Sequence, residues 1–280
     1  MRPVDRQTIL ITGSTDGLGR ALARDLAARG ARVLVHGRSD ERLRETAREI
    51  QAAAGGERPP TYRADFGSLD EVRRLAREVE RDHEQLDALV NNAGIGAGPG
   101  DDRREESADG HELRLAVNYL SHFLLTNLLL PTLRRSAPAR IVNVASAAQD
   151  PIDFDDPMLE RSYDGIRAYA QSKLALVLFT FELAERLRAG GADVTVNALH
   201  PASLMDTKMV REWFGRALTG VEEGVRAVRR LVIEPELDGV SGRYFDGLRE
   251  ARAHSKAYDE EARRRLWRLS ERWAGLEDPA

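Results

Sequence analysis

Short apolar stretches typical of β-strands alternate along the chain with longer segments in which apolar residues recur every three or four positions. The strand-like stretches lie at residues 8–12, 32–36, 61–64, 86–90, 140–145, 194–199 and 242–245. Strands that are apolar throughout and are separated by helices are typical of a parallel sheet covered on both faces. The pattern therefore predicts an α/β fold, with a doubly wound parallel sheet and helices on both of its faces.

The segments between the strands predict helices. The first helical pattern follows the glycine-rich turn and ends at residue 29, and the second covers residues 39–54. A third begins at Ser68, where Glu71 completes a capping-box pattern. Two longer ones cover residues 110–135, with a kink at Pro131, and residues 165–189. No linker rich in proline and serine divides the chain, so we expect a single domain over residues 1–280. We expect its core at about 8–246, a lid-like excursion at about 201–235 and a helical C-terminal tail at about 250–275.

Composition narrows the class of protein further. The 280 residues are 42% apolar, which is enough for a sizeable core, and the net charge of −4 argues against a dedicated nucleic-acid-binding protein. The chain contains no cysteine, so disulfides, thiolate nucleophiles and cysteine-ligated metals are excluded. No uninterrupted apolar run approaches the roughly 18 residues of a membrane span, and a strand-like run by Thr8 leaves no room for a signal peptide. We expect a cytoplasmic protein without membrane or nucleic-acid partners.

A glycine-rich turn separates the first strand from the first helix. It contains Gly13, Ser14, Thr15, Asp16, Gly17, Leu18 and Gly19. Such glycines allow a sharp turn and a close approach of the backbone to a pyrophosphate, while the helix N-terminus offers free N–H groups to phosphates. Glycine turns also occur without ligands and in methyltransferase folds, and this spacing differs from the commoner dinucleotide fingerprint. Its place between strand and helix favours a dinucleotide site in a Rossmann-type fold.

The ends of the second and third strands carry residues suited to the adenosine half of a dinucleotide. Gly37 stands where an acid would bind the ribose of NAD, and Arg38 supplies a guanidinium suited to a 2′-phosphate. The alternative for Arg38 is a solvated arginine in an arginine-rich chain. Asp65 is placed to accept a hydrogen bond from the adenine amine, with Phe66 in the same site. The alternative for Asp65 is a helix cap before Ser68.

Tyr169 and Lys173 lie four residues apart in the long predicted helix, so the phenol and the ammonium share one helix face. A phenol with a reference pKa near 10 is a poor acid–base catalyst at neutral pH. A neighbouring cation stabilises the phenolate and lowers that pKa. The pattern therefore indicates a proton-transfer pair, and the alternative is an ordinary surface pair of residues.

Polar and small residues end two neighbouring strands of the predicted sheet. Ser146 follows the fifth strand, and Asn92, Ala93 and Gly94 follow the fourth. Ligands of open α/β sheets bind at the carboxyl ends of the strands, so Ser146 is placed to bind a substrate carbonyl oxygen and the small residues leave room for a cofactor. Asn118 lies among apolar residues of a helix, where asparagine is disfavoured, so we expect it to make a specific hydrogen bond.

Together these motifs resemble those of the short-chain dehydrogenase/reductase family. The resemblance runs from about Thr8 to Phe245 and includes the glycine turn, Asn91-Asn92-Ala93-Gly94, Asn118, Ser146, Tyr169-x3-Lys173 and His200-Pro201. The stretch Phe154-Asp-Asp, the 23 positions from Ser146 to Tyr169 and the Arg-Arg-Leu-Trp267 tail further resemble the retinol-dehydrogenase-like branch.

The resemblance implies an enzyme that interconverts a carbonyl and an alcohol by hydride transfer. It implies Tyr169 as the general acid/base, Lys173 as the residue that lowers its pKa and binds ribose, Ser146 as the group that orients the carbonyl, and Asn118 as the support of a water-linked proton path. It favours NADP(H) as the cofactor, in agreement with Arg38, with NAD(H) as the alternative, and it requires no metal. A homodimer or tetramer, with dimerisation through the two long helices, is the implied assembly, which the C-terminal tail would oppose.

The chain departs from the family pattern after the sixth strand. Pro201 is followed by Ala202 instead of glycine, and Thr207, the expected contact of the nicotinamide amide, lies one position late because Asp206 occupies its place. The segment beyond is apolar, and a lid over an apolar carbonyl or alcohol substrate is one interpretation, with contacts from Met205, Met209 and Trp213. The other is an amphipathic helix packed on the sheet.

Two other functions remain open from the sequence. A non-catalytic dinucleotide-sensing or scaffold protein would keep the glycine turn, but it has no need of the Tyr169 and Lys173 pair. A methyltransferase on the same kind of sheet has no role for that pair either.

Overall fold

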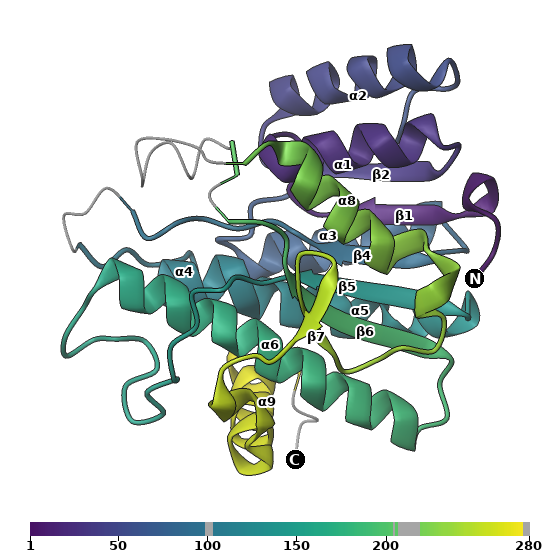
Figure 1. The fold of residues 1–280 in the computed structure, drawn as a ribbon. Helices are drawn as coiled ribbons and strands as arrows, with labels where there is room; N and C mark the ends of the chain where they lie inside the picture. The colour runs from purple at the N-terminus through teal and green to yellow at the C-terminus, as the bar shows by residue number, and fades with distance from the viewer. Residues whose placement is uncertain (99–102, 204, 207–218, 277–280) are drawn as a thin grey trace.

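One eight-stranded sheet forms the centre of the structure, a computed structural model that describes residues 1–98, 103–203, 205–206 and 219–276 (Figure 1). Across the sheet the strands follow the order β3-β2-β1-β4-β5-β6-β7-β8. Their bounds are β1 Thr8–Ile11, β2 Arg32–Gly37, β3 Thr61–Arg63, β4 Ala88–Asn91, β5 Ala139–Val144, β6 Val194–His200, β7 Tyr244–Asp246 and β8 Arg249–Ala251. Strands β1 to β7 are parallel, as predicted, and β8 is antiparallel to β7. The order reverses between β1 and β4, where such sheets bind ligands.

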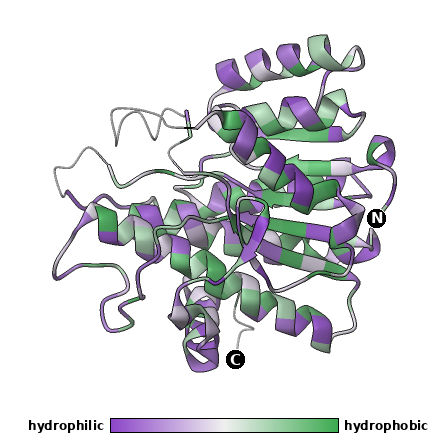
Figure 2. Ribbon diagram, viewed as in Figure 1, coloured by the Kyte–Doolittle hydropathy of each residue, from purple (hydrophilic) through white to green (hydrophobic). Residues whose placement is uncertain are grey.

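Helices cover both faces of the sheet, which confirms the predicted α/β fold. Figure 1 shows α1 (Gly17–Ala28), α2 (Asp40–Ala54) and α8 (Val221–Ile233) on one face, and α3 (Leu69–Asp82), α5 (Ser121–Arg135), α6 (Gly165–Ala189) and α9 (Glu260–Trp273) on the other. Side chains alternate across the strands: Ile9 and Ile11 join the core on the α1 side, and Leu10 joins the core on the α6 side. Figure 2 shows the apolar strands between helices whose outer faces are polar.

The predicted cap of α3 is only half of a capping box. Ser68 Oγ accepts a hydrogen bond from the Glu71 backbone N–H at 3.4 Å. The Glu71 carboxylate, however, accepts from the backbone N–H of Asp65 at 2.8 Å. It thereby ties the start of α3 to the end of β3 instead of returning to Ser68.

The predicted helix at 110–135 begins later and is irregular at a different place. Glu112 caps a short helix, α4 (Leu113–Leu115), which continues through a π-helical turn, Ala116–Leu120, into α5. Pro131 lies inside α5 and on its exposed side, and the helix continues through it to Arg135. The irregular turn instead surrounds Asn118. Such π-helical turns are frequent at functional sites.

Two predicted segments at the C-terminal end need correction. The excursion expected at 201–235 is too long, because residues Val221–Ile233 form α8, whose Val225, Val228 and Leu231 join the core on the α1 side. The tail expected to be helical over 250–275 begins with β8 and a short 3-10 turn, Ser255–Tyr258, and is helical only in α9. Strand β8 carries no apolar pattern, because two of its three residues are exposed at the sheet edge.

Helix α9 packs against α6 through an aromatic cluster. The Trp267 ring stacks on Phe179 with centroids 5.8 Å apart, and the Arg186 guanidinium lies 4.0 Å above the Trp267 ring. Tyr119 Oη and Ser270 Oγ are hydrogen-bonded at 2.5 Å. The C-terminal helix therefore covers the side of α6 that faces away from the sheet.

A segment of the structure, Leu113–Arg135, is long and apolar enough to cross a membrane by length and mean hydropathy. The sequence contains no uninterrupted apolar run of that length, so the segment is apolar only on average. Its most apolar window is 78% buried inside the protein. This segment forms the central helix of the core on the α6 side of the sheet. A buried core helix meets the same criteria of length and mean hydropathy as a membrane-spanning helix.

Candidate active site

Buried amides fix the ends of β4 and β5 against the helices behind them. Asn91 Nδ2 donates to Thr126 Oγ1 of α5 at 2.9 Å and to Asn143 Oδ1 at 2.8 Å. Asn143 Nδ2 in turn donates to Thr180 Oγ1 of α6 at 2.8 Å. All four side chains are fully buried, so each amide needs these partners. The chain of bonds fixes α6 relative to the strand ends from which the site is built.

The structure brings Tyr169, Lys173 and Ser146 together, as predicted. Tyr169 and Lys173 lie on one face of α6, with the Lys173 Nζ 5.8 Å from the centre of the Tyr169 ring. The Tyr169 phenol lies close enough to the Ser146 side chain, which follows β5, for the serine to lower its pKa. Lys173 Nζ donates to the carbonyl oxygen of Val144, the last residue of β5, at 3.0 Å. The phenol, the ammonium and the hydroxyl thus converge at the carboxyl edge of the sheet.

Burial dominates the protonation of both groups on α6. It raises the pKa of the Tyr169 phenol, and the nearby Ser146 side chain offsets only part of that increase. The lowered phenol pKa expected from the nearby lysine is therefore wrong for the structure as it stands. Burial also lowers the pKa of Lys173 to about 8. At neutral pH the phenol consequently keeps its proton, and the lysine is largely protonated.

Two side chains hold Ser146 in place by donating hydrogen bonds to its backbone carbonyl oxygen. Tyr244 Oη of β7 donates to that oxygen at 3.0 Å, and Gln149 Nε2 donates to it at 2.8 Å. The Ser146 hydroxyl accepts from the backbone N–H of Ala148 at 3.1 Å. These contacts fix the serine at the point where β5 ends.

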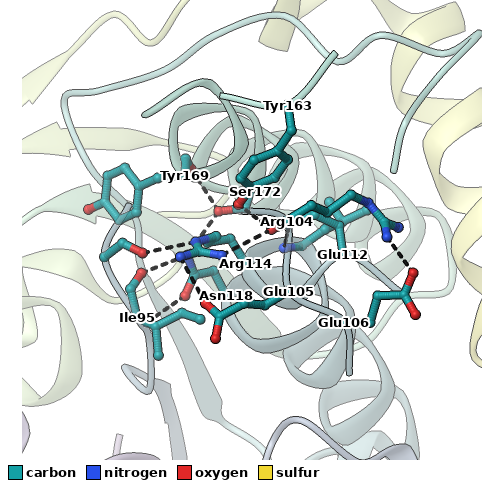
Figure 3. Close-up of polar contacts among 12 residues, drawn as sticks. Ile95, Arg104, Glu105, Glu106, Glu112, Arg114, Asn118, Tyr163, Tyr169 and Ser172 are labelled. Atoms are coloured by element: carbon teal, nitrogen blue, oxygen red, sulfur yellow. Dashed lines mark hydrogen bonds and ion pairs between the residues drawn. The ribbon is translucent and has the colours of Figure 1, made fainter. Parts of the chain in front are cut away.

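Asn118 makes the specific hydrogen bonds that its position in the helix predicted. Its Oδ1 accepts from the Ile95 backbone N–H at 2.8 Å, and its Nδ2 donates to the Ile95 carbonyl at 3.1 Å and to Ser172 Oγ at 2.9 Å (Figure 3). Ser172 Oγ donates to the carbonyl oxygen of Tyr169 at 2.7 Å. Asn118 therefore links the loop after β4 to the turn of α6 that carries Tyr169 and Lys173.

Gly94 lies between the two groups expected to share a proton path. A Cβ at this position would lie 3.1 Å from Asn118 Oδ1 and 3.5 Å from Lys173 Nζ. A side chain at this position would therefore crowd Asn118 Oδ1 and fill the space next to Lys173 Nζ. The absence of a side chain at Gly94 keeps the space beside Lys173 open.

The glycine turn is held in place by His36, a residue for which the sequence analysis gave no role. Gly13 has φ +64°, and a Cβ there would lie 2.8 Å from Ala93 Cα. The Gly13 backbone N–H donates to His36 Nδ1 at 3.0 Å. His36 Nε2 bonds the Ala64 carbonyl at 3.2 Å, and burial lowers the pKa of His36 to about 4. The ring is therefore neutral, with Nδ1 as an acceptor for the turn.

The rest of the turn lies where the sequence predicted, at the start of α1. Asp16 caps the helix by accepting from the Gly17 backbone N–H at 2.8 Å, and the Ser14 backbone N–H donates to the His36 carbonyl. A Cβ on Gly19 would overlap the carbonyl oxygen of Gly13 and the amide of Asn92. Leu18 is buried in the core beneath the turn. The close packing of strand, helix and the Asn92 loop thus depends on glycine.

The adenosine end predicted from Gly37, Arg38, Asp65 and Phe66 also lies at this edge of the sheet. A Cβ at Gly37 would lie 2.6 Å from Thr15 Cγ2, so an acidic side chain there would displace Thr15. Arg38 is exposed and forms no ion pair with any residue that the structure describes. Asp65 Oδ1 accepts from the Gly67 backbone N–H at 2.8 Å, so it stabilises the loop before α3 without capping it directly.

Comparison with known proteins identifies the family. A family model described as short chain dehydrogenase matches residues 7–217. The chain belongs to the short-chain dehydrogenase family. Mouse retinol dehydrogenase 13 is 40% identical over 287 residues, which cover 96% of this chain and 84% of that protein, and the similarity places the chain in the retinol-dehydrogenase-like branch.

Solved structures confirm the fold of this short-chain dehydrogenase. An uncharacterized protein from Mycobacterium paratuberculosis matches with a TM-score of 0.80 and 30% identity, over 98% of this chain and 96% of that one. A Shigella flexneri protein described as a short chain dehydrogenase, complexed with NADP, matches with a TM-score of 0.71 and 25% identity, over 87% of this chain and 98% of that one.

The structure of this short-chain dehydrogenase describes only part of the segment that follows β6. Pro201 is buried, and Met205 lies in the core, where its sulfur fills the space that a Cβ at Gly224 of α8 would occupy. Met205 therefore packs in the core, but it lies in an isolated β-bridge with Thr219 and not in the amphipathic helix given as the alternative. The predicted contacts Thr207, Met209 and Trp213 lie outside the described residues.

Several polar residues around the site were not identified from the sequence. Ser172 bonds the backbone carbonyl of Tyr169 and Tyr244 bonds that of Ser146, and neither has a sequence context that distinguishes it from other serines and tyrosines. Phe66, assigned to the cofactor, lies between the rings of His36 and His122 at centroid distances of 4.6 and 5.2 Å. Its side chain therefore packs in the protein interior.

Proposed function

We propose that this short-chain dehydrogenase is an NADP(H)-dependent oxidoreductase that interconverts a ketone or aldehyde and the corresponding alcohol, with Tyr169 as the proton donor and acceptor. The observation that carries the proposal is that the Tyr169 ring and the buried Lys173 ammonium lie together on one face of α6, beside Ser146 at the end of β5. These three groups lie at the same edge of the sheet as the glycine turn, where doubly wound folds bind dinucleotides.

The chain offers a suitable site for a dinucleotide. The glycine turn presents the N-terminus of α1 to phosphates, and Gly94 leaves open the space beside Asn118 Oδ1 and Lys173 Nζ. Arg38 has no carboxylate partner among the described residues, so its guanidinium is free for a 2′-phosphate. The NADP bound to the related Shigella flexneri protein supports the same choice. When bound, the nicotinamide supplies or accepts the hydride.

The polar groups of the chain handle the proton and the oxygen of the substrate. Ser146 Oγ and Tyr169 Oη are two hydroxyl donors that can meet the negative charge developing on a carbonyl oxygen. Because burial raises the pKa of Tyr169, its Oη carries a proton at neutral pH and can transfer it to the alcohol oxygen formed. The Lys173 ammonium stabilises the phenolate that remains.

The substrate class follows from the surroundings of the site and from the relatives. We propose an apolar carbonyl or alcohol that approaches beside the loop of residues 149–162, which contributes the half-buried Ile152 and Phe154. The name of mouse retinol dehydrogenase 13 makes a retinoid one member of the test panel and no more than that.

A spectrophotometric screen tests the proposed function. A panel of apolar ketones, aldehydes and alcohols is followed by NADPH absorbance with wild-type protein, with Tyr169→Phe and with Tyr258→Phe, in which an exposed tyrosine is changed. We expect Tyr169→Phe to reduce kcat by about 10²–10⁴-fold while still binding NADPH, because only the proton-transfer group is lost. Tyr258→Phe should retain wild-type activity.

Two results would contradict the proposal. Retained turnover by Tyr169→Phe would remove the role of the phenol. NADPH binding by the wild-type protein without turnover of any compound would favour the non-catalytic dinucleotide-sensing function instead.

A further inference from the structure

A buried ionic cluster lies one helical turn before Asn118. Glu112 and Arg114 have side-chain exposures of only 2% and 3%, and Arg114 Nη1 lies 3.7 Å from Glu112 Oε1 (Figure 3). Tyr163 Oη donates to Glu112 Oε1 at 3.1 Å, and its ring centre lies 5.8 Å from the Arg114 guanidinium carbon. We call Glu112, Arg114 and Tyr163 the Glu-Arg-Tyr cluster.

The cluster holds the start of the helix that carries Asn118. Glu112 Oε2 accepts from the Leu115 backbone N–H at 2.7 Å, so one carboxylate both caps α4 and binds Tyr163. Tyr163 stands two residues before Gly165, where α6 begins. The two helices that bear Asn118 and Tyr169 are therefore joined at their N-terminal ends by this carboxylate.

The same cluster holds the loop after β4 that borders the site. Arg114 Nε donates to the Gly96 carbonyl at 3.3 Å, while Asn118, four residues later, bonds both backbone groups of Ile95. The loop also abuts the start of α6, because a Cβ on Gly165 would overlap the carbonyl oxygen of Ala97. Any shift of Arg114 would therefore move the loop on which Asn118 depends.

Buried charges of this kind are costly to retain. Replacement of a buried ion pair by well-packed apolar residues is often neutral or stabilising, so such a pair is weak evidence for stability alone. Its value lies in geometry, because a buried carboxylate and guanidinium tolerate few arrangements. Here the fixed arrangement involves the three segments that border the catalytic pair.

We propose that the Glu-Arg-Tyr cluster is a positioning device that sets where Asn118 and the residue 94–98 loop lie relative to Tyr169 and Lys173. The proposal rests on the proposed function, since its consequence is measured on the reaction. The effect passes through Asn118, which bonds Ser172, and through Ser172, which bonds the Tyr169 carbonyl oxygen.

The test uses Tyr163→Phe, which removes one hydroxyl and keeps the ring beside Arg114. We expect kcat to fall about tenfold with the NADPH Kd and the substrate KM within twofold of wild type. We also expect hydrogen exchange of the Ile95 amide, which is bonded to Asn118 Oδ1, to become about tenfold faster. Glu105→Gln is the matched control, because Glu105 pairs with Arg114 at 3.2 Å but is 53% exposed.

The outcomes separate positioning from stability and from the proposed function. A lower Tm with kcat within twofold of wild type would show a purely structural role and overturn the proposal, as would unchanged exchange at Ile95. If the wild-type protein converts no compound of the panel, the proposed function fails, while the exchange at Ile95 still tests the positioning by itself. Arg114→Lys, which keeps the charge but not the Nε contact with the Gly96 carbonyl, should reproduce both effects.

Discussion

Replacing Lys173 by methionine should stabilise the fold at neutral pH while removing activity. Burial lowers the pKa of Lys173 from 10.5 to about 8, so the folded protein holds a costly charge at pH 7. A difference of 2.5 pKa units corresponds to about 3 kcal/mol of free energy of unfolding at 1.36 kcal/mol per unit. Methionine has a similar straight shape and no charge, so Lys173→Met does not carry this cost.

One lost contact reduces that gain. Lys173 Nζ donates to the Val144 carbonyl at 3.0 Å, and leaving a buried acceptor without its donor costs about 1–2 kcal/mol. We therefore expect Lys173→Met to raise the free energy of unfolding at pH 7 by about 1–2 kcal/mol, measured by urea denaturation without added dinucleotide.

The pH dependence identifies the cause. At pH values between about 8 and 10.5, Lys173 keeps its proton in the unfolded chain and loses it in the folded protein. The contribution of Lys173 to the free energy of unfolding of the wild type therefore rises with pH over this range. The stability difference between the variant and the wild type should thus shrink by about 2 kcal/mol from pH 7 to pH 9.5. A difference that stays constant over this range would refute the reasoning, because the cost would then not come from the buried charge.

Three further predictions concern the cofactor site and the C-terminal helix. Arg38→Ala should weaken NADPH binding about 10- to 100-fold and leave NADH binding nearly unchanged, as measured by fluorescence titration; equal losses would contradict the assignment of the 2′-phosphate site. His36→Leu should weaken binding of both dinucleotides about tenfold, because the Gly13 backbone N–H loses its acceptor. His36→Asn offers an oxygen near the position of Nδ1 and should bind both dinucleotides more tightly than His36→Leu. Equal affinities of the two variants would argue against a role of His36 in holding the glycine turn. Trp267→Ala should lower the free energy of unfolding by about 3–5 kcal/mol in urea denaturation, since it empties the stack on Phe179; a loss below 1 kcal/mol would mean that α9 adds little to the core.

The parts of the site that depend on local geometry could be predicted from the sequence. Tyr169 and Lys173 share a face because an α-helix places residues four apart on the same side, and the glycine turn follows from the strand and helix that flank it. Ser146 could be placed because parallel strands end at one edge of the sheet. Each of these inferences needs only the element that carries the residue.

The parts that depend on packing between distant segments could not be predicted. His36 supports the turn because the sheet brings its ring beside Gly13, 23 positions away in the chain, and no local pattern records that contact. The prediction of an excursion over the α8 residues is wrong because the sequence does not show that the apolar face of this helix meets the α1-side core. The raised pKa of Tyr169 likewise reflects burial, which only the assembled fold determines.

The two edges of the sheet limit how copies of the protein can associate. Both edge strands, β3 and β8, have only three residues, and they expose the charged side chains of Arg63, Arg249 and Glu250. The carbonyl of Arg63 is already taken by Arg74 Nη2 at 2.8 Å. Short, charged edges give an incoming strand few free backbone groups to pair with, which is how natural proteins prevent aggregation between sheets. Pairing of copies by strand addition is therefore disfavoured at both edges of the sheet.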